Sequence, residues 1–285
     1  LPAVTYDVAV IGAGFGGLYA HWKLRQQGLK LIGFEAASGV GGTWWWNRYP
    51  GARCDVESLE YCYGFSPELL EEWQWSERYA AQPEILRYAE HVAERFDLTR
   101  DIRFNTRIAA MRFDEAANCW ELETEGGECF RAQFVVTAVG CLSAPNKPDI
   151  AGFDSFGGDV HFTAAWPHDG VDLTGKRVGV IGTGSSGIQS IPVIAEHAAE
   201  LTVFQRTPNF SVPAHNGPID PAHEAEVRAD YPGWCRKIRN SYAGFGLMAP
   251  HGYGRRNYPD TVGSGGTDAP APQRYDTVSQ TAVMV

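Results

Sequence analysis

Residues 4–17 read V-T-Y-D-V-A-V-I-G-A-G-F-G-G, and this stretch decides the fold of the first half of the chain. The apolar run predicts a buried strand, and a helix is expected to follow over residues 15–27. Between the two, Gly12, Gly14 and Gly17 form a G-x-G-x-x-G loop. Such a loop lets the backbone approach a pyrophosphate, beside the positive N-terminus of the helix.

A second strand pattern over residues 29–35 completes a strand–helix–strand unit. Glu35 stands at its end, eighteen residues after Gly17. A carboxylate at this position accepts hydrogen bonds from ribose hydroxyls and repels a 2′-phosphate. The first unit is therefore predicted to bind a dinucleotide that has no 2′-phosphate.

The same pattern returns in the second half of the chain. A strand over residues 177–181 leads into the loop Gly182-Thr183-Gly184-Ser185-Ser186-Gly187, a helix from about Ser185 and a strand over 201–205. Here the position of the acid holds Gln205, followed by Arg206 and Thr207. A guanidinium pairs with a 2′-phosphate and a hydroxyl adds a hydrogen bond, which favours NADP(H) over NAD(H). The alternative is that Arg206 is a solvated strand end.

Two dinucleotide sites in one chain indicate electron transfer from a nicotinamide to a flavin. The six cysteines include no C-x-x-C pair, which disfavours a disulfide reductase, and their spacing fits no zinc site. We expect reduced thiols and no metal.

The charge balance excludes several classes of partner. The net charge is −10 and the isoelectric point is about 5.3. A nucleic acid or an anionic membrane would favour the opposite sign. No apolar run is long enough to span a bilayer, and the strand pattern near the start predicts no signal peptide. We expect a cytoplasmic protein.

The rest of the chain organises around these two units. Pro83 opens a helix whose apolar face holds Ile85, Leu86, Ala89, Val92, Ala93 and Phe96, residues 102–124 predict a meander of short strands, and 134–139 a buried strand. We expect an α/β fold with an FAD-binding domain over 1–145 and an NADP-binding domain over 146–249. We expect residues 250–285 to form an irregular, disordered tail.

Between the units lies the sequence G-G-T-W-W-W-N-R-Y-P-G-A-R-C-D, residues 41–55. Three consecutive tryptophans on a loop suit a flat ring system. The alternative is a structural aromatic loop with a surface ion pair between Arg53 and Asp55.

These residues resemble the type I Baeyer–Villiger monooxygenases, a family that includes cyclohexanone and phenylacetone monooxygenases. The resemblance covers residues 4–248. It rests on the loop above, on both glycine motifs, and on the fingerprint F-x-G-x-x-x-H-x-x-x-W-P, in which Phe156, Gly158, Trp166 and Pro167 are in register.

The resemblance implies an FAD- and NADPH-dependent enzyme that inserts one oxygen atom of O2 next to a ketone carbonyl, giving an ester or lactone. It implies flavin contacts at Phe15, Gly16, Glu35, Thr43, Trp44, Asp55, Tyr61 and Ile108, with further cofactor contacts at Gly12, Gly14, Gly17, Gly42, Trp45 and Cys54. The NADP contacts would be Thr183, Gly184, Ser185, Ser186, Gly187, Gln189, Arg206 and Thr207, with Arg53 on the nicotinamide side. Asp55 would be the catalytic residue that positions the essential arginine of the family.

The sequence departs from the family in two places. Phe162 stands where the fingerprint has histidine, and His161 comes one residue early. The family also extends far beyond residue 248, and both its essential arginine and the residues that select the ketone are expected there. Two alternatives stay open: a flavin monooxygenase that oxidises nitrogen or sulfur, disfavoured by Trp166-Pro167 and the N-R-Y-P-G loop, and a non-catalytic dinucleotide-binding fragment.

Overall fold

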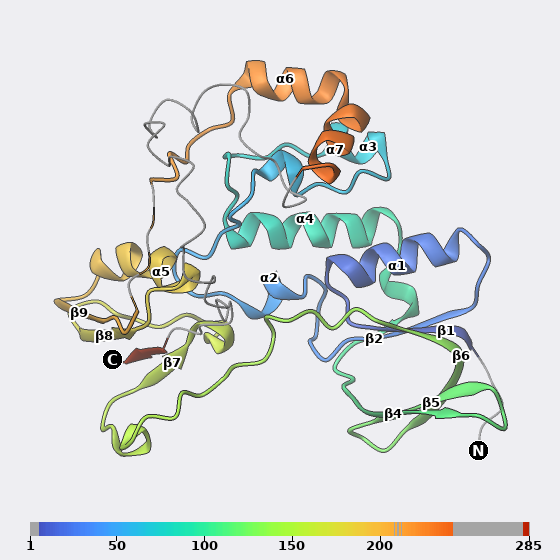
Figure 1. Ribbon diagram of the computed structural model, residues 1–285, viewed down its shortest axis with the longest axis horizontal. Helices are drawn as coiled ribbons and strands as arrows, with labels where there is room; N and C mark the ends of the chain where they lie inside the picture. The colour runs from blue at the N-terminus through green and yellow to red at the C-terminus, as the bar shows by residue number, and fades with distance from the viewer. Residues whose placement is uncertain (1–5, 208, 210, 212, 242–281, 285) are drawn as a thin grey trace, which may run out of the picture. The chain divides into compact units, whose positions relative to one another are not determined.

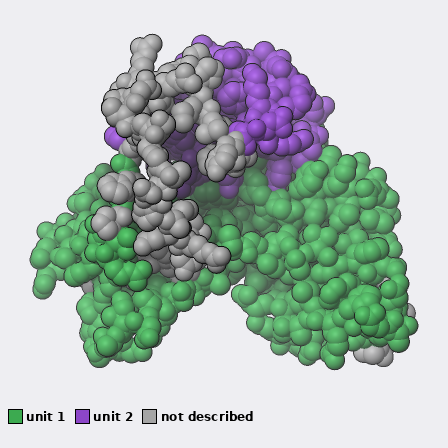
Figure 2. All heavy atoms as spheres, in the orientation of Figure 1, with its two compact units in different colours: residues 1–52, 81–211, 280–285 green, residues 53–80, 212–279 purple. Residues whose placement is uncertain are grey.

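The computed structural model describes residues 6–207, 209, 211, 213–241 and 282–284. The chain divides into two compact units (Figure 2). Unit 1 comprises residues 1–52, 81–211 and 280–285, and unit 2 comprises 53–80 and 212–279. Both predicted glycine loops belong to unit 1, so the division does not follow the expected boundary after residue 145, which stays a prediction.

The first sheet of unit 1 has six strands in the order β3-β2-β1-β6-β5-β4 (Figure 1). Their bounds are β1 Tyr6–Ile11, β2 Leu31–Phe34, β3 Ile102–Arg103, β4 Ile108–Asp114, β5 Cys119–Thr124 and β6 Cys129–Thr137. The strands β3, β2, β1 and β6 run parallel, and β4, β5 and β6 pair antiparallel in sequence order. Of the meander expected over residues 102–124, β4 and β5 are found, whereas β3 pairs with β2 at the opposite edge of the sheet.

Alternation along β1 places successive side chains on opposite faces of this sheet. Val8 and Val10 pack with residues of α1 (Phe15–Arg25), whereas Ala9 faces the meander. The helix α4 (Gln82–Arg95) packs against α1, with the rings of Phe15 and Tyr88 6.1 Å apart. Its predicted apolar face is confirmed for Ile85, Leu86, Ala89, Val92 and Ala93, which are buried, whereas Phe96 caps the helix end and is half-buried.

The second sheet has four strands in the order β7-β10-β8-β9. Their bounds are β7 Val160–Phe162, β8 Arg177–Ile181, β9 Glu200–Phe204 and β10 Ala282–Met284. The parallel pair β8 and β9 flanks α5 (Ser185–Ala195) in sequence, which confirms the second strand–helix–strand unit. The short elements of unit 1 are α2 Thr43–Trp46, η2 Thr99–Asp101, η3 Phe153–Ser155 and η4 Thr163–Ala165.

Unit 2 is held together by pairing between its two distant segments. Its elements are η1 Ser58–Glu60, α3 Pro67–Glu72, α6 Pro221–Ala229 and α7 Tyr231–Arg239. Asn216 accepts a hydrogen bond from the backbone of Tyr79, and Arg228 donates to the carbonyl of Trp73. His223 lies 3.3 Å from the carboxylate of Glu57.

Two expectations about the fold are wrong. The strand expected to be buried at 134–139 exposes 62% of Phe134 and 57% of Val139, the latter because β6 ends at Thr137, while Val135 and Val136 pack against core clusters of the first sheet. The end of the expected irregular tail forms β10, which is hydrogen-bonded between β7 and β8, because Val283 is apolar enough to enter the core of the second sheet. Residues 250–281 lie outside the described residues.

No helix within the described ranges is long and apolar enough to cross a membrane.

Candidate functional site

The first glycine loop and the tryptophan loop lie against each other. The amide of Gly41 donates to the carbonyl of Ala13 at 3.0 Å. A Cβ atom on Gly42 would lie 2.7 Å from Cα of Gly14, so position 42 needs glycine, and a Cβ atom on Gly14 would lie 3.3 Å from Cα of Gly42. Gly42 also has φ +55°, which side chains disfavour. The fold therefore brings together two segments that were predicted to contact FAD.

Glu35 is buried against the same loop, with 6% of its surface exposed. Its carboxylate accepts hydrogen bonds from the amide of Ala13 at 2.6 Å and from that of Ala37 at 2.8 Å. The acid thus lies beside the glycine loop, where we expect the ribose of the nucleotide.

A small pocket of about 190 Å³ extends this region. It is lined by Ala36, which follows Glu35, and by residues 105–107, which precede Ile108. The amide of Thr106 donates to the carbonyl of Glu35 at 2.8 Å. Sequence reasoning missed residues 105–107, because only the pairing of β2 with β3 brings them to Glu35.

The starts of α1 and α5 suit anionic groups. Gly14 and Gly184 are the N-cap residues, neither helix has an acidic residue in its first turn, and within the described chain neither has a side-chain cap. Uncapped amides and the helix dipole favour phosphate at such a terminus. The residues present therefore fit a dinucleotide at each loop.

The second glycine loop is hydrogen-bonded to residues that follow β9. Thr183 accepts hydrogen bonds from Gln205 at 2.9 Å on its hydroxyl and from Asn209 at 2.8 Å on its carbonyl. Arg206 and Thr207 are exposed just beyond β9. Two side chains that follow β9 thus fix the loop, while the guanidinium is accessible to a ligand.

The tryptophans have protein partners. Trp44 is 7% exposed. The ring of Trp45 lies under the guanidinium of Arg48 at 4.9 Å and edge-on to His168 at 5.4 Å. Burial and the nearby Arg48 lower the pKa of His168. Trp45 thus packs against protein side chains, and its expected contact with the cofactor stays a prediction.

Four expected cofactor residues belong to unit 2. Arg53 pairs with Glu77 at 3.5 Å and donates to the carbonyl of Tyr79 at 3.4 Å. Burial raises the pKa of the Cys54 thiol to about 11, so this thiol is protonated at neutral pH. Asp55 is exposed and Tyr61 is half-buried.

The displaced histidine of the fingerprint turns toward Trp166, with ring centroids 5.5 Å apart. Its neighbour Phe162 stacks on Phe153 instead, at 6.0 Å. Because neighbouring strand residues point to opposite faces, the side chain of His161 cannot take the place of a histidine at position 162.

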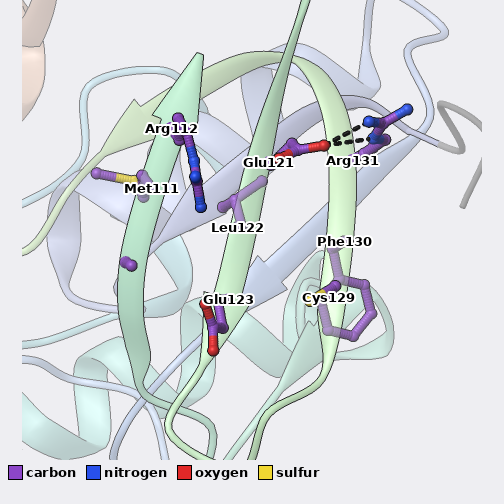
Figure 3. A pocket seen from close by; sticks show the side chains of 9 residues that line it. Met111, Arg112, Glu121, Leu122, Glu123, Cys129, Phe130 and Arg131 are labelled. Carbon is purple, nitrogen blue, oxygen red and sulfur yellow. Dashed lines mark hydrogen bonds and ion pairs between the residues drawn. The ribbon is translucent and has the colours of Figure 1, made fainter. Parts of the chain in front are cut away.

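A larger pocket of about 400 Å³ lies on the meander strands β4–β6 (Figure 3). Arg131 is ion-paired there with Glu121. None of the expected site residues lines this pocket.

Comparisons with known proteins agree with this geometry. Residues 6–230 match the family model described as pyridine nucleotide-disulphide oxidoreductase. A Baeyer–Villiger monooxygenase of Pseudooceanicola batsensis is 49% identical over 85% of this chain and 44% of its own length. A phenazine N-monooxygenase of Lysobacter antibioticus is 48% identical over 83% of this chain and 44% of its own length. A structure of oxidised steroid monooxygenase bound to NADP is 59% identical, with a TM-score of 0.81, over 86% of this chain and 47% of that one.

Two glycine loops that open helices in two sheets, together with this match, place the chain in the pyridine nucleotide-disulphide oxidoreductase family. Within it, the chain belongs to the type I Baeyer–Villiger monooxygenase family. It spans about half the length of the curated relatives that it matches.

Proposed function

We propose that unit 1 binds FAD at the first glycine loop and NADPH at the second. The observation that carries this is the contrast between two equivalent strand ends. Glu35 is buried beside the first loop, whereas Arg206 is exposed beside the second. A carboxylate rejects a 2′-phosphate and a guanidinium attracts one, so the two sites differ in specificity.

FAD, when bound, supplies the redox centre that receives electrons from NADPH and reacts with O2. The residues of this chain bind the two nucleotides and orient them. The amides at the starts of α1 and α5 hold the pyrophosphates, and Glu35 holds the adenosine ribose. Residues 105–107, with the backbone of Ile108, enclose the adenine end.

We further propose that the complete protein oxygenates ketones to esters or lactones. Asp55 positions an arginine that lies beyond residue 248, and Arg53 faces the nicotinamide. Support comes from the relatives, of which one is a cyclohexanone 1,2-monooxygenase, 45% identical over 84% of this chain. Small ketones and O2 are then the reactants.

One relative favours a second candidate. The phenazine N-monooxygenase is almost as similar as the Baeyer–Villiger relative, at 48% against 49% identity. The N-R-Y-P-G loop and Trp166-Pro167 therefore do not by themselves exclude oxidation of nitrogen.

A chimera separates these candidates. Residues 1–248 are joined to the part of the Pseudooceanicola batsensis relative that the match leaves out. The purified chimera receives FAD, NADPH and air, with cyclohexanone in one reaction and phenazine in another. We expect caprolactone with NADPH and far less with NADH. A chimera that retains FAD but forms only a phenazine N-oxide would replace the proposal with the second candidate.

A further inference from the structure

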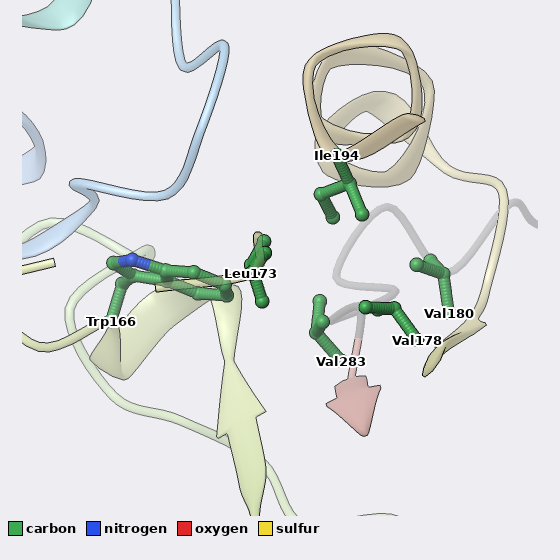
Figure 4. Close-up of a cluster of buried hydrophobic side chains, with 6 residues drawn as sticks. All are labelled: Trp166, Leu173, Val178, Val180, Ile194 and Val283. Atoms are coloured by element: carbon green, nitrogen blue, oxygen red, sulfur yellow. The ribbon is translucent and has the colours of Figure 1, made fainter. Parts of the chain in front are cut away.

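The segment from Trp45 to Gly51 follows Gly42, which lies against the first glycine loop. It contacts α5, the helix that begins at the second glycine loop. The hydroxyl of Tyr49 donates to Oε1 of Gln189, on α5, at 2.8 Å. Tyr49 is also partly buried and packs against the core cluster of the second sheet. Figure 4 shows the six residues of this cluster, which are Trp166, Leu173, Val178, Val180, Ile194 and Val283. A side chain from the flavin-side loop is thus built into the core of the other sheet.

The backbone of the same segment meets the same residue. Gly51 has φ +78°, and a Cβ atom there would lie 2.2 Å from the carbonyl oxygen of Gln189. It would also approach Val193 at 3.1 Å. Tyr49 and Gly51 therefore fix Gln189 from its side chain and from its backbone.

The N-terminal end of this segment is held beside the first glycine loop. Gly42 touches Gly14, and α2 follows directly. The side chain of Asn47 donates to the carbonyl of Thr43 and to that of Leu142, both at 2.9 Å. A continuous run of contacts, all within unit 1, leads from the first glycine loop to Gln189.

We propose that Tyr49 is a positioning residue that couples the two nucleotide sites by fixing the amide of Gln189. The inference rests on the proposed function, which places NADP(H) against Gln189. The hydroxyl of Tyr49 holds the carbonyl end of the amide, which fixes the orientation of the Gln189 side chain. A coenzyme that depends on this orientation stabilises the Tyr49 contact and the loop behind it, and linkage makes the effect reciprocal.

The test measures FAD affinity of the 285-residue chain by quenching of flavin fluorescence, without and with saturating NADP⁺. In the parent chain we expect NADP⁺ to tighten FAD by about fivefold or more, a usual size for coupled sites. In Tyr49→Phe, which loses only the hydroxyl, the two dissociation constants should agree within about twofold. Tyr19→Phe is the matched control, since Tyr19 is 43% exposed on α1, and it should keep the parental coupling.

A double-mutant cycle excludes a purely structural effect. Gln189→Met should also abolish the coupling, and adding Tyr49→Phe should change nothing more, while all variants keep the parental melting temperature. Retained coupling in Tyr49→Phe, or a parent that binds both nucleotides without coupling, would overturn the inference and leave the proposed function intact. A parent that binds neither nucleotide would overturn both.

Discussion

At the scale of single residues, the two strand ends differ in burial as well as in charge. Glu35 is held by two backbone amides, while Arg206 is exposed. The residue types could be predicted from the sequence because the glycine loop fixes their place in the chain. The contact of Ala13 with Glu35 could not, since it depends on how the loop folds back over β2.

Arg206→Ala should weaken NADPH binding by about 1.5–3 kcal/mol, the contribution of a charge-assisted hydrogen bond. NADH has no 2′-phosphate, so its affinity should hardly change. Titration of both coenzymes against the parent and the variant measures this. Equal losses for the two coenzymes would show that Arg206 does not read the 2′-phosphate.

A second prediction concerns His21, which is fully buried on α1. Neither of its ring nitrogens has a hydrogen-bond partner among the described residues. Burial lowers its pKa to about 4, opposed by Asp101 and reinforced by Arg25. The folded state thus resists protonation that the unfolded chain accepts, so stability falls as the pH drops from about 6.5 towards 4.

His21→Leu removes this titration. The free energy of unfolding of the variant, relative to the parent, should rise by about 3 kcal/mol between pH 7 and pH 4. Urea unfolding at several pH values measures the difference. A constant difference across this range would mean that His21 is not held neutral.

At the scale of elements, local signals were sufficient for some and insufficient for others. The starts of α1 and α5 were predicted because strand, glycine loop and helix are adjacent in the sequence. Three apolar residues at 282–284 carry no comparable signal, and their strand exists only through pairing with β7 and β8. The contact of Tyr49 with Gln189 likewise joins residues 140 positions apart.

A further prediction concerns the strand β10. Val283 is fully buried, so Val283→Asp places a carboxylate in the core and should destabilise unit 1 by about 3 kcal/mol or more. Val203→Asp is the control, because Val203 is 39% exposed in the same sheet. Thermal unfolding compares the two. Similar melting temperatures for both variants would remove β10 from the core.

At the scale of the whole molecule, the chain carries both predicted nucleotide loops but about half of the length of its relatives. We expect the 285-residue chain alone to oxidise NADPH without forming more than a trace of lactone. Loss of one preorganised charge at the reacting centre costs about 3 kcal/mol or more in the barrier, and we propose that this charge comes from an arginine beyond residue 248.

The measurement is product analysis with cyclohexanone and phenylacetone, under NADPH and air, together with detection of hydrogen peroxide. Peroxide in proportion to the NADPH consumed agrees with the prediction. Substantial lactone or ester from this chain alone would show that the part of the relatives that the match leaves out is dispensable for oxygenation.

The central claim is that the first loop binds FAD and the second binds NADPH, and crossing two variants tests it most directly. FAD and NADPH affinities are measured for the parent, for Glu35→Ala and for Arg206→Ala, with circular dichroism to confirm folding. We predict that Glu35→Ala loses FAD affinity and keeps NADPH affinity, and that Arg206→Ala does the opposite. A folded Glu35→Ala chain that retains FAD as well as the parent does, or a variant that weakens both nucleotides equally, would contradict the account.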